Sequence, residues 1–506
     1  MFKVTAQHAA FFNWVASPTS ASAVLEAVAG SGKTSTLQQA MQRIDSSESV
    51  LYLAFNKAAV AEMTSRGVPT NCTPLTLNSL GFRACLRAFG RVDVDTGKTM
   101  SLIKARYGER SMIWFSLAGT IKNLVGKAKT VGLVPTDVVG ARGVVADTRD
   151  EWIAIVDQFS IDAPNDDDTL LDTAIECARE ILRDGIRDVT TIDFDDQIYL
   201  PVVMRLPMPK FQWVLIDEAQ DISVLNRRLL ARCIDDDGHL IACGDRHQSI
   251  YGFRGAAHDS IDAIVEEFKA ELFPLSVTYR CPRRVVTAAQ VYVPHIEACE
   301  SAADGEIHVG VAASEINWLP SDLVVCRNNA PLVTLAYALL RKRVPCRISG
   351  RDIGTGLAAL VKKLKARDLD DLLAKLAKHV EKQVTKLMRV GRETAIATLQ
   401  DQAETLTQFA LECKTLAELT TAISELFTDD LSRPMTTLSS VHKAKGGEAD
   451  RVIILDPWRF PSKRSTSTAA LQQERNLYYV ALTRARRELV FATINGGGLA
   501  MPPAQF

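Results

Sequence analysis

Short apolar runs recur along the chain, and each is followed by a stretch with helix-like spacing of its apolar residues. The runs are "VLEAVAG" (24–30), "VLYLAFN" (50–56), "FQWVLIDE" (211–218), "HLIACGD" (239–245), "DLVVCRN" (322–328) and "DRVIILD" (450–456). Continuous apolar strands separated by helices are typical of parallel sheets that are covered on both faces. Because the runs form one group before about residue 275 and another after it, the pattern predicts two α/β cores.

Two segments interrupt this alternation. Residues 91–190 lack clear strands, and residues 355–430 contain no proline and carry Leu, Ala and Lys at helical spacing. Both segments are therefore expected to be mainly helical insertions, one in each core. The predicted limits are 1–90 with 190–275 for the first core, 91–189 for its insertion, 276–354 with 432–506 for the second core, and 355–431 for its insertion.

Composition narrows the class of protein. The 506 residues carry a net charge of −1, so any affinity for nucleic acid must come from local basic patches. Ten cysteines occur without a CxxC pair, which favours a reduced, intracellular protein. The sequence shows neither a signal peptide nor an apolar span of 18 residues. We expect a monomer without a membrane partner, in the cytoplasm or, in a eukaryote, in the nucleus.

The stretch "EAVAGSGKTSTL" (26–37) has the composition of a phosphate-binding loop between a strand and a helix. In such a loop backbone N–H groups surround the phosphates, while Lys33 contacts the terminal phosphates and Thr34 contacts Mg²⁺. The strict pattern has glycine where Ala27 stands, so the match is to a variant of the motif. The phosphate-binding residues expected here are Gly30, Ser31, Gly32, Lys33 and Thr34.

A second acidic motif, "VLIDEAQD" (214–221), ends an apolar strand. Asp217 is placed to hold Mg²⁺, directly or through water, and Glu218 to orient and deprotonate the attacking water. A solvated acidic strand end is common for one carboxylate. Two consecutive acids at the end of an apolar strand, in a chain that also has a phosphate-binding loop, instead indicate a nucleoside triphosphatase.

Further motifs follow one another in a recognisable order. They are "TAQHAAF" (5–11), "LAFNKAAVAEM" (53–63), "IDFDD" (192–196), "GDRHQSIYGFRGA" (244–256), "VTYRCP" (277–282), "SSVHKAKGGEADRVIIL" (439–455) and "ERNLYYVALTRAR" (474–486). With the two acidic and glycine-rich motifs, the chain resembles the UvrD/Rep-type superfamily 1 DNA helicases. The resemblance covers residues 1–90, 190–350 and 432–493. It implies two RecA-like P-loop cores that use ATP and Mg²⁺.

The resemblance assigns further residues to the nucleotide. Gln248 would contact the γ-phosphate and the attacking water, and Arg280 and Arg484 of the second core would be its arginine fingers, although each has an alternative as a surface ion pair. Ser35 stands where the family often has an arginine over adenine. Contacts with the adenosine part are implied for Gln7, Ser35, Tyr279 and Glu448.

The resemblance also implies a track for single-stranded DNA. Phe55 and Phe253 would face the bases, since stacking on an aromatic ring tolerates any base; ordinary core packing stays open for Tyr251 and Phe253. Asn78 replaces the usual histidine of the "TLNSLG" segment, and Gly447 replaces an apolar residue in "KGGE". The DNA-binding residues implied are Phe55, Asn78, Tyr251, Phe253, Arg254 and His442.

The predicted function is an ATP-dependent DNA helicase or translocase that moves 3′→5′, acts in replication, repair or recombination, and binds single-stranded DNA and junctions with duplex. Repair or replication proteins are possible partners. Two alternatives remain: a DNA-stimulated ATPase that strips proteins from single strands, and an ATP-switched recruitment module. Two stretches rich in basic residues could contact DNA phosphates. They are 361–393, which has ten Lys/Arg against five Asp/Glu, and 101–115, where basic residues are mixed with aromatic ones. Alternative readings are a solvated helix face for the former and core packing of Trp114 and Phe115 for the latter.

Overall fold

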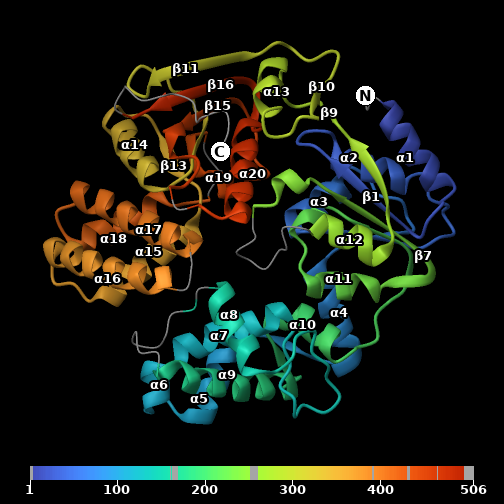
Figure 1. Ribbon diagram of the computed structural model, residues 1–506, viewed down its shortest axis with the longest axis horizontal. Coiled ribbons are helices and arrows are strands. Elements are labelled where there is room, and N and C mark those ends of the chain that lie inside the picture. The colour runs from blue at the N-terminus through green and yellow to red at the C-terminus, as the bar shows by residue number, and fades with distance from the viewer. Residues whose placement is uncertain are drawn as a thin grey trace. The chain divides into compact units, whose positions relative to one another are not determined.

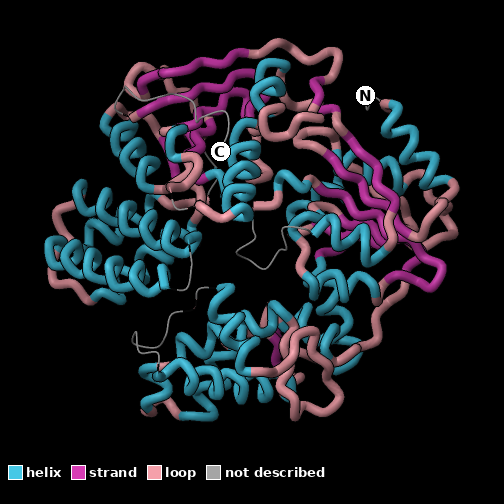
Figure 2. The backbone as a smooth tube through the Cα atoms, in the orientation of Figure 1, coloured by secondary structure: helices cyan, strands magenta, loops and turns pink. Residues whose placement is uncertain are grey.

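The chain is described by a computed structural model over residues 4–159, 161, 169–250, 260–389, 393–429, 434–463 and 465–494. Two compact units are found, residues 1–27 with 32–275 and residues 28–31 with 276–506. Each contains a β-sheet and a separate group of helices (Figures 1 and 2).

The sheet of the first unit has six parallel strands in the order β3-β2-β6-β7-β1-β8. Because parallel strands end at the same edge of a sheet, the loops that follow β6, β7 and β1 are neighbours there. The strands are β1 Ser22–Ala27, β2 Val50–Ala54, β3 Cys72–Thr76, β6 Phe211–Ile216, β7 Ile234–Gly244 and β8 Glu271–Leu275. This edge is where the predicted phosphate-binding and acidic motifs meet.

Both faces of this sheet are buried, which explains why its central strands each contain a continuous apolar run. One hydrophobic cluster includes Phe11, Leu37 and Trp213, and a separate cluster includes Val24 and Val214. Each edge strand contains a proline, Pro74 in β3 and Pro274 in β8. The helices around the sheet are α1 Ala6–Ala16, α2 Lys33–Met41, α3 Lys57–Ser65, α4 Leu77–Phe89, α10 Asp196–Val203, α11 Val224–Ala231 and α12 Ser260–Phe268.

The first insertion is mainly helical and shares a core with the sheet. One of the two hydrophobic clusters continues without interruption from the sheet to Trp152 and Ile181 of the insertion. Its helices are α5 Lys98–Tyr107, α6 Met112–Ser116, α7 Ala118–Val131, α8 Arg149–Phe159 and α9 Thr169–Arg187. The expectation that 91–190 lack strands misses β4 Asp93–Val94, which pairs with β5 Thr191–Ile192. These strands are too short to give an apolar pattern.

Buried charges join this insertion to the first core. The carboxylate of Asp196, at the start of α10, has no exposed surface and pairs with Lys98 at 2.9 Å and Lys129 at 2.8 Å. Lys129 also pairs with Asp193 at 2.6 Å. Burial acts to lower the pKa of Lys129, but Asp196 and Asp193 outweigh it and raise the pKa. The "IDFDD" segment is therefore the anchor of two insertion helices.

The sheet of the second unit also has six parallel strands, in the order β11-β16-β15-β12-β14-β13. The strands are β11 Glu306–Ala312, β12 Leu323–Cys326, β13 Cys346–Ile348, β14 Thr436–Ser440, β15 Ala449–Leu455 and β16 Ala485–Thr493. A short pair, β9 Val277–Thr278 with β10 Glu297–Ala298, lies outside it. The helices are α13 Arg283–Ala289, α14 Ala330–Arg341, α19 Val441–Ala444 and α20 Thr468–Leu482.

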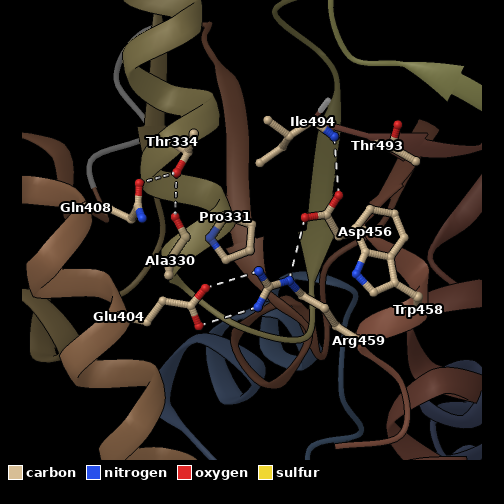
Figure 3. A pocket seen from close by; sticks show the side chains of 10 residues that line it. All are labelled: Ala330, Pro331, Thr334, Glu404, Gln408, Asp456, Trp458, Arg459, Thr493 and Ile494. Carbon is tan, nitrogen blue, oxygen red and sulfur yellow. Dashed lines mark hydrogen bonds and ion pairs between the residues drawn. The ribbon is translucent and has the colours of Figure 1, made fainter. Parts of the chain in front are cut away.

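The second insertion consists of helices that share the core of the second sheet. They are α15 Arg351–Leu364, α16 Leu369–Arg389, α17 Glu393–Glu412 and α18 Leu416–Leu426. Arg459, which follows β15, pairs with Glu404 of α17 at 3.1 Å and with Asp456 at 3.6 Å. Figure 3 shows these ion pairs beside a cavity of about 340 Å³ that Trp458 and Gln408 also line. The ion pair between Arg459 and Glu404 thus joins this insertion to the segment that follows β15.

The fold class predicted from the sequence is confirmed, with two parallel-sheet cores and a mainly helical insertion in each. The predicted strand at 24–30 ends earlier, at Ala27, because the chain turns into the glycine-rich loop. The predicted strand at 239–245 begins earlier, at Ile234, where its residues are polar and largely exposed. The exact limits of cores and insertions stay predictions.

We predict that Asp196→Asn lowers the free energy of unfolding by at least about 3 kcal/mol, because it leaves two buried lysines without a full counter-charge. The matched control is Asp172→Asn, which removes an ion pair with Arg149 whose side chains are 60% and 65% exposed. The control should change stability by less than about 1 kcal/mol. Urea denaturation followed by circular dichroism measures both. Equal, small changes would show that the buried network does not anchor the insertion.

Candidate active site

The phosphate-binding loop has the backbone that the sequence requires. Gly30 and Gly32 have φ of 72° and 84°, in the left-handed region that side chains disfavour. Gly32 immediately precedes α2 and has no side chain to cap it, and N–H groups at the N-terminus of a helix suit an anion. Lys33 donates from Nζ to the carbonyl of Ala27 at 3.3 Å. The lysine therefore lies folded over the loop that it would serve.

Thr34 and Asp217 meet at the end of the first sheet. The Thr34 hydroxyl donates to Asp217 Oδ2 at 3.0 Å, and the hydroxyl of Tyr52 lies 3.5 Å from the same oxygen. Burial and then the charge of Glu218 raise the pKa of Asp217 to about 6, against the opposing effect of Lys33. A bound cation would stabilise the charged form of this buried carboxylate and so offset the free-energy cost of its desolvation.

The donor set fits Mg²⁺. The hydroxyl of Thr34 and the carboxylate of Asp217 are hard oxygen ligands, and Mg²⁺ is usually held by one or two such groups together with water and phosphate oxygens. Over the described ranges, no group of three or more His, Cys, Asp or Glu could form an all-protein metal cage. The arrangement suits a metal that arrives with a nucleotide.

Glu218 has an unusual backbone conformation. Its φ is 54°, in the left-handed region, although it is not glycine. Its N–H donates to Asp217 Oδ1 at 2.8 Å, and its carboxylate accepts a hydrogen bond from Gln220 Nε2 at 2.5 Å. Strain of this kind is maintained by surrounding contacts and clusters at functional sites. The two carboxylates of the motif thus have different side-chain partners, Thr34 for Asp217 and Gln220 for Glu218.

Gln248 lies in the loop after β7 and is buried, with 5% of its surface exposed. Its Nε2 donates to Asp245 Oδ2 at 2.7 Å. The loop is therefore braced from within at the edge of the sheet that also carries Asp217. Tyr251, Phe253 and Arg254, the continuation of this motif, lie outside the described residues.

In the second unit, two residues predicted to bind nucleotide contact each other. Arg280 forms an ion pair with Glu448, and Glu448 also pairs with Arg486 at 2.8 Å. Arg280 donates to the carbonyl of Thr483 at 3.4 Å. Tyr279 is 39% exposed, which leaves part of its ring available for stacking.

Arg484 is buried rather than at the surface, with 1% of its surface exposed. Its guanidinium donates to the carbonyls of Val480 at 2.9 Å and Gly447 at 3.2 Å, and to Thr483 Oγ1 at 3.1 Å. The alternative of a surface ion pair is therefore wrong for Arg484. The backbone of Gly447, where the sequence departs from the family, supplies one of its acceptors.

Residues implied in DNA binding have mixed surroundings. Phe55 is 51% exposed just after β2. Asn78 donates from Nδ2 to the carbonyl of Phe194 at 2.9 Å, so its amide braces the "IDFDD" segment. His442 lies in the short helix α19. Phe115 is 75% exposed, whereas Trp114 packs against the core. The core-packing alternative therefore holds for Trp114 and is wrong for Phe115.

Two further predicted positions lie near the start of the chain and of α2. Gln7 is half-buried in the first turn of α1. Ser35 accepts a hydrogen bond from Arg66 NH1 at 3.3 Å. The guanidinium of Arg66, the residue that follows α3, therefore lies beside the position where the family often has its own arginine.

Sequence reasoning gave no role to Gln220 or Tyr52. Gln220 lies inside the quoted "DEAQD" motif, which was the available signal, and its side chain contacts Glu218 of the same motif. Its second partner, Asp245, comes from another loop, which a local motif does not reveal. Tyr52 lies in β2, where an aromatic residue is expected for packing alone. Its hydroxyl near Asp217 follows from the adjacency of β2 and β6.

Comparisons with known proteins match both units. A family model described as an AAA domain matches residues 14–254, and one described as a UvrD-like helicase C-terminal domain matches residues 351–496. The chain is 24% identical to DNA helicase II of Haemophilus influenzae over 409 residues, which cover 58% of this chain and 56% of the relative. It therefore spans little more than half of that protein.

Two other relatives agree. ATP-dependent DNA helicase UvrD2 of Mycobacterium tuberculosis is 23% identical over an alignment of 563 positions, which covers 94% of this chain and 78% of the relative. ATP-dependent DNA helicase Rep of Escherichia coli is 27% identical over 123 residues, 22% of this chain and 18% of the relative. Among the residues that the structure describes, no helix has the length and apolar character needed to cross a membrane.

We predict that Asp217→Asn raises the stability of the nucleotide-free protein at pH 7.5 while abolishing turnover. Asp217 is buried and its pKa is raised to about 6, so its charge at this pH costs on the order of 1–3 kcal/mol. Thermal melting without Mg²⁺ measures the gain, and Asp236→Asn, at an exposed position in β7, serves as the control. A lower melting temperature for Asp217→Asn would contradict the interpretation.

Proposed function

Because the chain belongs to the UvrD/Rep-type superfamily 1 DNA helicases, which are ATP-dependent enzymes, we propose that it tracks along single-stranded DNA in the 3′→5′ direction and separates strands at junctions with duplex. The observation that carries the proposal is the contact between Thr34 and Asp217, with Glu218 beside it. This contact joins the phosphate-binding loop to the two acids needed for hydrolysis.

We propose the following roles in hydrolysis. Glu218 accepts the proton of the attacking water, and Lys33 balances charge on the terminal phosphate as its bond to the β-phosphate breaks. Thr34 and Asp217 would hold Mg²⁺, which when bound neutralises charge on the phosphate oxygens. Gln248 positions the water from the loop after β7. The remaining loop residues, Gly30, Ser31 and Gly32, offer backbone N–H groups to the phosphates.

The second unit would contribute positive charge and adenosine contacts. In this proposal Arg280 and Arg484 act as arginine fingers, which are worth ~10³–10⁵ in rate in related phosphoryl transfers. Tyr279 would stack on adenine and Glu448 would bind the ribose. Since Arg280 and Glu448 pair with each other in the structure, we propose that nucleotide binding competes with this ion pair. Part of the binding energy would be used for that step.

We propose that single-stranded DNA contacts the exposed ring of Phe55, together with Asn78 and His442. The exposure of Phe55 supports stacking on bases. The exposed Phe115 of the first insertion suits a junction with duplex. The biological setting would be replication, repair or recombination, where such junctions arise.

We predict that Glu218→Gln reduces ATP turnover by at least ~10²-fold, the usual worth of a general base. Lys33→Ala should also reduce turnover strongly, because it removes the positive charge beside the terminal phosphate. Glu218→Gln should still bind ATP, because the phosphate-binding loop is untouched. Steady-state hydrolysis and equilibrium binding of a fluorescent ATP analogue measure the two effects. Turnover at the wild-type rate in Glu218→Gln would exclude Glu218 as the base.

Strand displacement tests the direction of movement and the alternatives. Duplexes with a single-stranded tail at the 3′ or 5′ end are incubated with ATP and the wild-type protein, with Glu218→Gln as control. We expect displacement from the 3′-tailed duplex only. ATP hydrolysis stimulated by single strands without displacement would favour a protein-stripping ATPase, and hydrolysis indifferent to DNA would favour a recruitment switch.

A further inference from the structure

Gln220 joins two loops of the candidate active site. Its Nε2 donates to Glu218 Oε2 at 2.5 Å, and its Oε1 accepts from the N–H of Asp245 at 3.0 Å. Its side chain is buried, with 1% of the residue exposed. The carboxylate of Glu218 can only accept and the N–H of Asp245 can only donate, so both ends of the amide are fixed by their partners.

The chain of contacts continues beyond Asp245. This residue is 2% exposed, and its carboxylate accepts from the N–H of His247 at 3.0 Å and from Gln248 Nε2 at 2.7 Å. A continuous path therefore runs from Glu218 through Gln220 and Asp245 to Gln248. It connects the loop after β6 with the loop after β7.

The backbone opposite Gln220 is shaped for this contact. A Cβ atom at Gly244, the last residue of β7, would lie 2.5 Å from Gln220 Oε1 and 3.0 Å from its backbone nitrogen. The backbone of Gly244 is not in the left-handed region that favours glycine. The close approach of the Gln220 side chain, rather than backbone conformation, therefore accounts for glycine at this position. Any larger residue would push the amide away from Asp245.

We propose that Gln220 is a positioning residue for hydrolysis: it holds the carboxylate of Glu218 in place and links it to the loop that carries Gln248. The inference rests on the proposed function of Glu218 as the base. A glutamate at this position would keep an acceptor for the Asp245 N–H but would face Glu218 with a like charge. An apolar residue of similar size would lose both contacts. Only an uncharged amide satisfies both partners.

The test separates catalysis from nucleotide binding. In Gln220→Met we expect kcat to fall about 10- to 100-fold, since a misplacement of about 1 Å at a reacting group can cost ~10²-fold. The dissociation constant for a fluorescent ATP analogue should change less than about threefold, because the phosphate-binding loop is untouched. Gln220→Glu should lose at least as much kcat, through repulsion of Glu218.

The matched control is Gln212→Met. Gln212 lies at the opposite end of β6 and accepts from the N–H of Ser49 at 2.8 Å, so it makes a comparable bond to backbone away from the site. Its variant should keep the wild-type kcat. Gly244→Ala supplies a second route, because it displaces the Gln220 amide without changing it, and should reproduce the fall in kcat with ATP binding intact.

Three outcomes decide the matter. A selective fall in kcat in both Gln220→Met and Gly244→Ala supports the positioning role. Wild-type kcat in either folded variant overturns it, and so does a parallel loss of kcat and ATP binding. If Gln220→Met does not fold, Gly244→Ala and Gln220→Glu decide. Wild-type turnover in Glu218→Gln would instead show that the proposed function itself is wrong.

Discussion

A parallel sheet ends all its strands at one edge, and the chemistry of the first unit depends on that constraint. The order β6-β7-β1 brings three loops together that are far apart in the sequence. The hydrogen bond between Thr34 and Asp217 spans from the helix after β1 to the loop after β6. Gln220 then connects the loops after β6 and β7. Without this strand order the motifs would be separate features of the chain.

Two residues at this edge, Asp217 and Glu218, have conformations or charge states that would by themselves destabilise the fold. Asp217 is buried, and its pKa is raised because burial and Glu218 both oppose its charge. Glu218 has a left-handed backbone. The surrounding apolar clusters and the satisfied amide of Gln220 hold these groups in place. A strained backbone and a buried charge are expected where a site is organised before its substrate binds, because the surrounding structure offsets their free-energy cost.

The sequence was sufficient to identify the interior strands that contain a continuous apolar run, such as β1, β2, β6 and β15. It missed β3 and β8, which lie at the edges of their sheet and contain proline, and β14, whose residues are mostly Thr and Ser. It also missed β11 and β13, at the edges of the second sheet, and β16, which has charged residues near its start. The acids and the lysine of the site were identifiable because their motifs are local. The hydrogen bond between Gln220 and Asp245 joins residues 25 positions apart. The ion pair between Arg280 and Glu448 also joins residues from two separate motifs, so no local pattern predicts it. Such contacts depend on strand order, which periodicity does not encode.

The prolines at the two borders of the first sheet affect how the molecule meets its neighbours. An edge strand exposes a row of backbone donors and acceptors that an incoming strand can bind. Pro74 in β3 and Pro274 in β8 each remove one donor from such a row. An added strand would leave an acceptor unsatisfied at either border. The strongly apolar interior of this sheet is thereby protected from growing into an intermolecular β-structure, which matters most for a crowded, newly synthesised chain.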